Sequence, residues 1–264
     1  ISTNSDLFLL DVTNPAAEAR KITANPAADG GPAYSPDGRY IAYRAQQRPG
    51  FEADRWQLML YDRKSGEHKS VTASWDRSAD SYIWAPDSKA VFVTAENEGR
   101  SDIFRLIMPG GEPQPILLAG TNGDLGISGG GRSLVFSQAS LSAPVELFVG
   151  PLDGAEGQVL RGVRRLTRTN PSLAAFKLRP AENVWFEGAG GTKIQAWVVK
   201  PPDFCEGRKY PLLYLVHGGP QNSWHDGWTF RWNAQVFASA GYVVFMPNPR
   251  GSTGFGQQFT ADIS

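Results

Sequence analysis

The sequence is poor in cysteine, in net charge and in long apolar runs. Cys205 is the only cysteine among the 264 residues, which excludes an internal disulfide and a metal site made of several thiolates. The 26 basic residues balance the 26 acidic ones, so the charge gives no reason to expect nucleic acid or an anionic membrane as a partner. No apolar run reaches the roughly 18 residues of a membrane-spanning helix. We therefore expect a globular protein without a membrane span, with its single thiol in a loop.

Histidine is also scarce, and none of the three histidines has the spacing of a metal site. His68 is expected in a solvated turn, and His217 is expected to orient a glycine-rich turn through a hydrogen bond. His225, beside Asp226, is left open between a functional role and simple exposure. Gly251–Gly256 lacks the lysine and the spacing of a phosphate-binding loop. The sequence therefore predicts no metal ion and no other cofactor.

The first part of the chain contains a repeat of short apolar strands. Turns of the type Pro-Asp-Gly and Pro-Asp-Ser join some of them, and such turns suit a type I turn with proline in second place. A period of about 40–50 residues is typical of propeller blades. The pattern predicts a partial β-propeller of about three to four blades, with further residues expected upstream to close its open edges. The expected strands lie within Leu7–Asp11, Pro32–Tyr43, Gln57–Asp62, Tyr82–Val93, Asp102–Leu106, Gly126–Phe136 and Val145–Val149, and the last is expected to begin a fourth copy.

The second part of the chain has the pattern strand, glycine turn, helix, strand. Leu212–Val216 is an apolar run that predicts a buried central strand, and it enters a sharp turn at His217–Pro220. Trp228–Ala240 has apolar residues at helical spacing, and Tyr242–Met246 is a second apolar strand that leads into Pro247–Gly256. Ligands bind beyond the carboxyl ends of the strands in such a βαβ unit. The alternative for the His217–Pro220 turn is an ordinary glycine-rich turn after a strand.

A hairpin is expected before this unit, from Asn183–Phe186 and Lys193–Val199 with a turn at Gly188–Gly191. It is predicted to form the outer antiparallel strands of the same sheet. Gly150–Pro180, which has weak periodicity, is expected to cross over from the propeller to this sheet.

Two motifs together resemble a known family. His217-Gly-Gly-Pro220, followed by Asn248-Pro-Arg-Gly-Ser-Thr-Gly-Phe-Gly256, is similar to the start of the α/β-hydrolase domain in the prolyl oligopeptidase family of serine peptidases. Within this family the chain resembles the acylaminoacyl-peptidase and dipeptidyl-peptidase V branch, and Phe51–Trp56, with Trp75–Ser78 before Tyr82–Trp84, resembles dipeptidyl-peptidase V in particular. The resemblance implies a partial β-propeller over residues 1–165. It also implies the N-terminal part of an α/β-hydrolase domain over residues 166–264, truncated before the nucleophile elbow.

The resemblance also implies a chemistry, the hydrolysis of short peptides by a serine exopeptidase through an acyl-enzyme. In this family a backbone N–H of the His-Gly-Gly-Pro loop forms half of the oxyanion hole, which corresponds to Gly219 here, and Gly218 lies beside it. Arg250 is interpreted first as a structural side chain that bridges loop carbonyls, and second as a substrate contact. Glu52 and Asp54 are candidates for binding the amino terminus of the substrate, because carboxylates suit that role. The alternative for these two carboxylates is a solvated acidic loop.

The catalytic serine, acid and histidine of this family are expected downstream of Gly256, in that chain order. The 264-residue chain is therefore predicted to be inactive alone. Gly126–Gly130 matches the pattern G-x-S-x-G around Ser128, but a strand rather than a helix is expected after it, so we reject Ser128 as a nucleophile. Ser252 is expected to brace its own loop.

A second hypothesis is that the propeller half is a non-catalytic binding or assembly module. Short peptides are the expected substrates, and a second copy of the chain or a downstream fragment stays open as a protein partner. The compartment also stays open. The resemblance implies the periplasm or secretion for a protein like dipeptidyl-peptidase V, and the cytoplasm otherwise.

Overall fold

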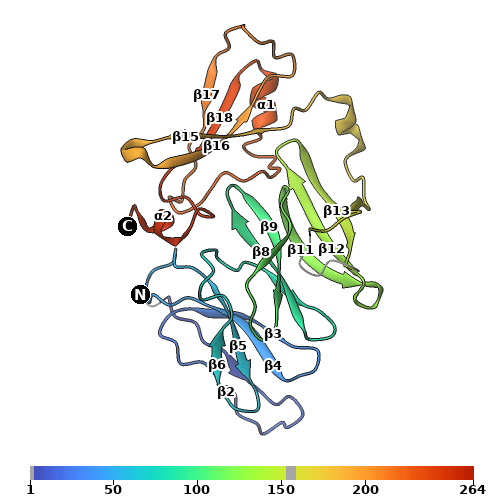
Figure 1. Ribbon diagram of the computed structural model, residues 1–264, viewed down its shortest axis with the longest axis vertical. Coiled ribbons are helices and arrows are strands. Elements are labelled where there is room, and N and C mark those ends of the chain that lie inside the picture. The colour runs from blue at the N-terminus through green and yellow to red at the C-terminus, as the bar shows by residue number, and fades with distance from the viewer. Residues whose placement is uncertain (1–2, 153–158) are drawn as a thin grey trace.

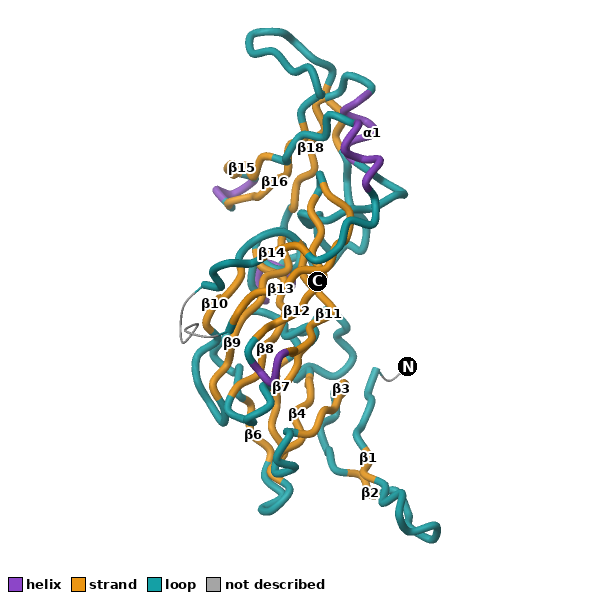
Figure 2. Tube along the Cα trace, turned by 90° about the vertical axis from the view of Figure 1, so that its right-hand side faces the viewer, coloured by secondary structure: helices purple, strands orange, loops and turns teal. Residues whose placement is uncertain are grey.

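The computed structural model describes residues 3–152 and 159–264. Residues 1–2 of the expected propeller and residues 153–158 of the expected crossover lie outside the described residues. The molecule is elongated: strands β1–β14 form the lower sheets, and β15–β18 with α1, α2 and their loops form the upper unit (Figure 1). Figure 2 shows the C-terminus between these two parts.

The first of the lower sheets is a four-stranded antiparallel sheet in chain order, β3-β4-β5-β6. A separate two-stranded ribbon, β1-β2, precedes it. The turn between β3 and β4 is fixed by its own side chains, because Asp37 Oδ1 accepts hydrogen bonds from Ser35 Oγ at 2.6 Å and from Arg39 N at 3.0 Å. The strands are β1 (Phe8–Leu9), β2 (Arg20–Lys21), β3 (Asp29–Tyr34), β4 (Tyr40–Ala45), β5 (Gln57–Asp62) and β6 (His68–Ser70).

The second lower sheet has eight strands and consists of two antiparallel runs of four. One parallel pairing, Thr121 opposite Ser101, joins the two runs. Val145–Val149 lies in β13 and pairs with β12, just as β5 pairs with β4 and β9 with β8. It therefore holds the position of the strands that begin the earlier copies of the sequence repeat, and it lies in the same sheet as the strand before it. The strands are β7 (Tyr82–Trp84), β8 (Ala90–Asn97), β9 (Arg100–Ile107), β10 (Gln114–Leu117), β11 (Thr121–Ser128), β12 (Ser133–Ser140), β13 (Ala143–Pro151) and β14 (Arg164–Arg165), with the short 3-10 helix η1 (Gly129–Gly131) before β12.

Strand β8 shows how the lower sheets pack on one another. Its side chains alternate between two apolar clusters, since successive residues of a strand point to opposite faces. Val91 and Val93 pack with Leu58 of β5, whereas Phe92 packs with Phe136 of β12. All five side chains are at most 3% exposed. The core of the lower sheets therefore lies between sheet faces, and β8 is buried on both of its faces.

The upper unit is built on a four-stranded sheet in the order β15-β16-β18-β17. The first two strands form the predicted antiparallel hairpin, and β17 runs parallel to β18 with α1 between them in the chain, which confirms the βαβ prediction. Two 3-10 helices, η2 (Pro171–Ala175) and η3 (Ala189–Gly191), lie before β15 and in the hairpin turn. The main elements are β15 (Glu182–Glu187), β16 (Lys193–Val199), β17 (Leu212–Tyr214), α1 (Ala234–Ser239), β18 (Val243–Asn248) and α2 (Gln257–Ala261).

Within the described chain, Leu212–Val216 does not form the buried central strand that the sequence predicts. The strand ends at Tyr214 and lies at the edge of the sheet, where β18 is its one neighbour among the described residues. Leu212 is 61% exposed and Val216 is 74% exposed. The apolar run fixes the strand, but burial needs a further element packed on it, which the described chain does not supply.

The helix in Trp228–Ala240 is shorter than the apolar spacing of this segment predicts. It begins after Asn233, whose Oδ1 accepts a hydrogen bond from Gln235 N at 2.8 Å and so caps the first turn. Trp232 and Val236 lie mostly exposed, and the helix buries Ala234 and Ala238 instead. The aromatic residues before Asn233 therefore form an irregular segment rather than the first turns of the helix.

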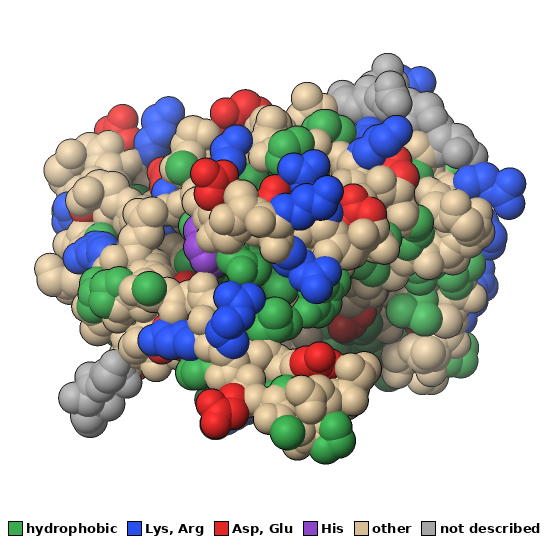
Figure 3. Space-filling view, turned by 90° about the horizontal axis from the view of Figure 1, so that it is seen from below, with side chains coloured by type: hydrophobic (Ala, Val, Ile, Leu, Met, Phe, Trp, Pro, Cys, Tyr) green, Lys and Arg blue, Asp and Glu red, His purple; other side chains and the backbone are tan. Residues whose placement is uncertain are grey.

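The lower end of the molecule carries basic, acidic and apolar side chains in a mixed arrangement (Figure 3). This agrees with the balanced charge of the sequence. No helix of the described residues is long and apolar enough to cross a membrane. In the part of the chain that the structure describes, no group of three or more His, Cys, Asp or Glu side chains is placed to hold a metal ion.

Candidate functional site

The two glycine-rich motifs meet at the carboxyl ends of β17 and β18. His217 Nε2 lies 3.0 Å from Ser252 Oγ, and Ser252 Oγ donates to the carbonyl of Pro249 at 2.6 Å. Because the one hydroxyl proton of Ser252 goes to Pro249, Nε2 of His217 donates to Ser252. Ser252 is fully buried. The structure thus confirms that His217 holds its turn through a hydrogen bond and that Ser252 braces its own loop.

The amides of Gly218 and Gly219 are uncovered. Both residues are exposed, and neither N–H donates a hydrogen bond to any of the described residues. Gly219 has a φ of +137°, and a Cβ built there would lie 2.8 Å from Cβ of Asn222, so a larger residue would displace the turn. Unpaired amides held in a fixed turn are suited to bind a negatively charged oxygen.

A cavity of about 250 Å³ lies between the lower sheets and the second glycine-rich loop. Glu52 and Asp54, the two carboxylates that the sequence suggests for substrate binding, both line it, and Gln221 lines it just after the first glycine-rich turn. Gly218, Gly219 and Arg250 are not among its lining residues. The cavity therefore has Glu52 and Asp54 on one side and the segment after the His217–Pro220 turn on the other. The turn itself does not line the cavity.

The carboxylates of Asp54 and Glu52 differ in whether they already accept hydrogen bonds. Asp54 is buried, and its Oδ2 accepts hydrogen bonds from the amides of Gln47 at 2.7 Å and Arg48 at 2.9 Å. Glu52 is exposed, and its carboxylate has no partner among the described residues. Asp54 therefore shapes its loop, while Glu52 keeps its carboxylate available to the cavity.

Arg250 is exposed, and its guanidinium makes no hydrogen bond or ion pair with the described residues. The first interpretation, a structural side chain that bridges loop carbonyls, is therefore wrong for this structure. The loop that contains Arg250 is instead held by hydrogen bonds of Ser252 and Thr260. Oγ1 of Thr260 donates to the carbonyl of Ser252 at 3.0 Å.

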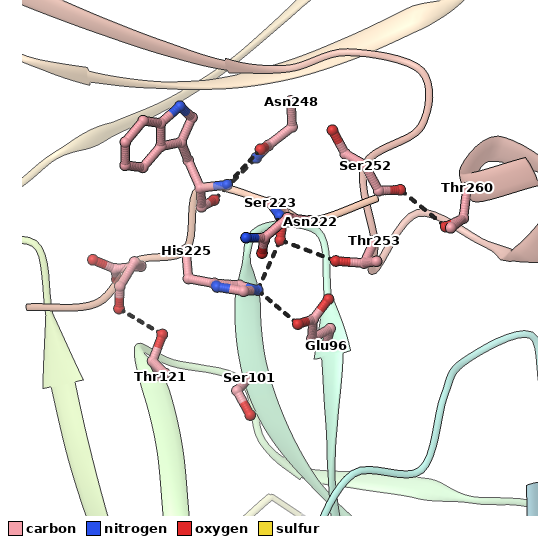
Figure 4. Close-up of polar contacts among 12 residues, drawn as sticks. Glu96, Ser101, Thr121, Asn222, Ser223, His225, Asn248, Ser252, Thr253 and Thr260 are labelled. Carbon is pink, nitrogen blue, oxygen red and sulfur yellow. Dashed lines mark hydrogen bonds and ion pairs between the residues drawn. The ribbon is translucent and has the colours of Figure 1, made fainter. Parts of the chain in front are cut away.

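Sequence reasoning missed a polar cluster around His225, which Figure 4 shows. His225 Nε2 lies 3.1 Å from Oε1 of Glu96 and 2.7 Å from Oγ of Ser223. Thr253 Oγ1 donates to Ser223 Oγ at 3.4 Å. Glu96 comes from the end of β8, so the cluster joins the lower sheets to the segment after the first glycine-rich motif and to the second motif. No local pattern links Glu96 to a histidine so far away in the chain, and only the packing of the two parts brings them together.

The cluster resembles a Ser-His-acid triad in composition but not in geometry. In a triad the acid contacts Nδ1 of the histidine, and the serine contacts Nε2. Here Glu96 and Ser223 both contact Nε2 of His225, so the acid cannot orient the ring while Nε2 takes a proton from serine. Ser223 is also buried, with 7% of its surface exposed. The cluster is therefore not a nucleophile triad.

Three carboxylates near the contact between the lower sheets and the upper unit have shifted pKa values. Burial alone would raise the pKa of Glu96, but the hydrogen bond and charge of His225, with a contact from Thr253, outweigh burial and lower it. Oε2 of Glu96 is buried and accepts no hydrogen bond of normal geometry. Burial raises the pKa of Asp102 to about 6. Burial also raises the pKa of Asp226, although the amide of Leu141 and the charge of Arg100 oppose it.

The β8–β9 hairpin makes further contacts with the upper unit. The amide of Glu98 donates to the carbonyl of Gly254 at 3.0 Å, and the amide of Asp226 donates to the carbonyl of Gly99 at 2.7 Å. A Cβ added at Gly99 would lie 2.8 Å from Nε1 of Trp197. The hairpin tip is therefore fitted closely against the upper sheet and both loops.

The other sequence candidates lie elsewhere. Ser128 ends β11 and is followed by η1 and β12, as expected for a turn rather than a nucleophile elbow. His68 is exposed but lies in strand β6 rather than a turn, and its Nδ1 is 2.8 Å from Oη of Tyr43. Cys205 is an exposed free thiol in a loop.

Comparison with known proteins gives relatives along nearly the whole chain. Residues 228–264 match the model of the "Prolyl oligopeptidase family". The chain is 36% identical over 243 residues to dipeptidyl-peptidase 5 of Trichophyton schoenleinii, an alignment that covers 90% of this chain and 32% of the relative. The same coverage and identity hold for dipeptidyl-peptidase 5 of Arthroderma benhamiae. The chain thus spans about a third of the length of the curated relatives it matches.

Several solved structures of peptidases are similar to this chain in fold. Acylaminoacyl peptidase of Pyrococcus horikoshii has a TM-score of 0.75 at 23% identity, covering 98% of this chain and 37% of that protein. Dipeptidyl peptidase 4 of Porphyromonas gingivalis has a TM-score of 0.67 at 22% identity, covering 96% of this chain and 36% of that protein. Both are peptidases that combine a propeller with an α/β-hydrolase domain. At this identity the likeness supports the fold rather than a substrate.

Proposed function

This chain belongs to the prolyl oligopeptidase family, and from that premise we propose that it carries the oxyanion-binding side of a serine exopeptidase active site. The activity is the hydrolysis of short peptides through an acyl-enzyme, of the dipeptidyl-peptidase or acylaminoacyl-peptidase type. The observation that carries the proposal is the pair of uncovered amides at Gly218 and Gly219, held beside a cavity between the two parts of the molecule.

The proposal divides the chain into two domains. Residues 1–165 form part of a β-propeller of about three to four blades, which the successive four-stranded runs β3–β6, β7–β10 and β11–β14 support. Residues 166–264 form the start of the α/β-hydrolase domain, before its nucleophile elbow. The exposed apolar edge at β17 supports this division, because further strands of a hydrolase sheet would cover it.

In the proposed reaction, a serine attacks the peptide carbonyl and the N–H of Gly219 donates to the oxygen as it gains negative charge. Such a donor contributes about 3–4 kcal/mol to the stability of the transition state. The hydrogen bond between His217 and Ser252 supports this role, because it fixes the turn before the substrate binds. Preorganised donors need no reorientation during the reaction.

Three residues are proposed to contact the substrate, and a fourth, Asp54, is proposed to shape the loop that carries one of them. Glu52, with its free carboxylate at the cavity, binds the ammonium group of the peptide's amino end. Asp54 shapes the same loop through the amides it accepts. Gly218 and Arg250 contact the peptide near the reacting carbonyl. One solved relative, an acylaminoacyl peptidase, was crystallised with Z-Gly-Gly-Phe-chloromethyl ketone, which supports a peptide as the substrate class.

We place the catalytic serine, acid and histidine outside this sequence, so that the 264-residue chain alone is inactive. A fluorophosphonate probe, which labels activated serines, tests this. In the complete protein, the probe is expected to label one serine that mass spectrometry locates outside residues 1–264. The isolated chain is expected to stay unlabelled. Labelling of Ser223 or Ser252 in the isolated chain would overturn the proposed division of the site.

The alternative, a non-catalytic binding or assembly module, predicts a different outcome. The complete protein would then also stay unlabelled and would hydrolyse no dipeptide or acyl-amino acid substrate. A labelled complete protein with peptide hydrolysis excludes this alternative.

A further inference from the structure

Glu96 stands where the β8–β9 hairpin meets the upper unit, and its carboxylate contacts His225 there (Figure 4). An ionised carboxylate can only accept hydrogen bonds. Because Oε1 of Glu96 and Oγ of Ser223 both lie within hydrogen-bond distance of Nε2 of His225, that nitrogen carries a proton and shares it between the two oxygens. The contact therefore fixes both the orientation of the ring and the position of its proton.

One branch of contacts leads from His225 to Gly219. Ser223 donates its backbone N–H to Oδ1 of Asn222 at 2.8 Å, and Asn222 N donates to the carbonyl of Pro220 at 3.0 Å. Asn222 also lies so close to Gly219 that an added Cβ would be 2.8 Å away. There is little free space in this branch, so a displacement of Ser223 displaces the Gly219 amide.

A second branch leads through the other glycine-rich loop. Thr253 Oγ1 donates to Ser223 Oγ, and Thr253 N donates to the carbonyl of Asn222 at 3.2 Å. Thr253 follows Ser252, which holds His217 at the start of the turn. The two branches approach the His217–Gly219 turn from opposite sides, and both begin at the contact between Glu96 and His225.

We propose that Glu96 and His225 are positioning residues that hold the Gly219 amide in the geometry needed for hydrolysis. This inference rests on the proposed function, since it takes Gly219 as the oxyanion donor. Neither residue contacts the reacting atoms. The consequence is that a side chain of the lower sheets sets the geometry of a loop in the upper unit, so the site is correctly formed only when the two parts are in contact.

Protonation of Glu96 breaks this contact. His225 and Thr253 lower the pKa of Glu96 against the effect of burial, so the contact is present above the ordinary pKa of a glutamate and is lost as the pH falls through the lowered value. Other charged groups on the packed elements are Asp76, Arg77, Glu98, Arg100, Asp102 and Asp226. The pKa of Glu96 is raised by burial and lowered by His225 and Thr253, and none of these other groups contributes to the shift.

Kinetics of the complete protein test the proposal. Glu96→Gln and His225→Asn are each expected to lower kcat on a peptide substrate by on the order of tenfold, because a small misplacement of a catalytic group is costly. KM is expected to stay within about twofold. The double variant is expected to lose no more than either single variant, because both act through one contact. Glu98→Gln is the matched control, an exposed glutamate on the same hairpin, and is expected to leave kcat unchanged.

A rise in KM with unchanged kcat would overturn the proposal, because Glu96 also lines the cavity and would then bind substrate directly. Additive losses in the double variant would overturn it as well. Equal melting temperatures of the parent and the variants show that a lower kcat does not come from unfolding.

A titration of the Glu96 carboxyl carbon by NMR separates this proposal from the proposed function. In His225→Asn the pKa of Glu96 is expected to rise, because the effect of burial then acts without the opposing charge and hydrogen bond of His225. If the parent protein hydrolyses no peptide, the proposed function fails while this shift still supports the contact. If the parent hydrolyses peptides and the titration of Glu96 does not move, the positioning role fails alone.

Discussion

The lower sheets and the upper unit differ in how completely they bury their apolar side chains. Phe136, Leu58 and Ile103 of the lower sheets are fully buried. In the upper unit, Leu212 of β17 and Val236 of α1 are more than half exposed. Both regions have the apolar patterns of regular elements, so the pattern alone does not decide burial. Burial depends on a second face to pack against, which each lower sheet has and the outer side of the upper unit lacks within the described chain.

The strongest test of this difference is a pair of large-to-small changes. Phe136→Ala is expected to lower the free energy of unfolding by about 3–5 kcal/mol, because it leaves a cavity between packed sheets. Phe230→Ala, at a phenylalanine that is 80% exposed, is expected to change it by less than about 0.5 kcal/mol. Urea unfolding of both variants gives the two values. Equal losses would show that the two regions do not differ as described.

The contact between the two regions is tested by two glycines with nearly equal φ. Gly99 and Gly66 have φ of +77° and +79°, but an added Cβ meets Trp197 Nε1 at 2.8 Å in the first case and open space in the second. Gly66→Ala is expected to cost about 1 kcal/mol from the left-handed conformation alone. Gly99→Ala is expected to cost about 3 kcal/mol, because overpacking adds to that strain. Thermal unfolding checks the order, and an equal cost would mean that the hairpin tip is not closely packed.

A smaller effect is expected at Asp102, near the same contact. Burial raises its pKa to about 6 in the folded chain, whereas an unfolded aspartate has a pKa of about 3.9. The unfolded state therefore loses its proton first, so this group lowers stability as the pH rises from about 4 to about 6, with no further change above. Asp102→Asn is expected to raise the free energy of unfolding by about 1–2 kcal/mol at pH 8 and to leave it unchanged at pH 4. Urea unfolding at both pH values checks this, and an equal effect at both would contradict the raised pKa.

The same comparison shows what the sequence could predict. Strand β5 has the predicted bounds, Gln57–Asp62, because an apolar run between polar turns specifies a strand locally. The parallel pairing of β17 with β18 also followed from the order of the elements. The burial predicted for β17 is not found in the described chain, because burial depends on what packs against a strand, and a local pattern does not specify that.

The candidate site likewise contains contacts that the sequence predicted and contacts that it did not. The hydrogen bond that holds His217 and the bracing role of Ser252 were predicted, since both act within or between adjacent loops. The contact between Glu96 and His225 was not predicted, because it arises from the packing of two parts that are far apart in the chain. The free guanidinium of Arg250 was also not predicted, since the loop carbonyls found other donors.

The most direct test of the account removes the N–H of Gly219 without adding a side chain. In the complete protein, glycolic acid incorporated at position 219 replaces the N–H of Gly219 with an ester oxygen and adds no side chain. We expect kcat for a peptide substrate to fall by about 10²–10³-fold with little change in KM, the loss typical of an oxyanion donor. The same replacement at Gly207, an exposed loop glycine with open space around it, is expected to leave kcat unchanged. An unchanged kcat after the replacement at Gly219 would contradict the claim that this amide binds the oxyanion.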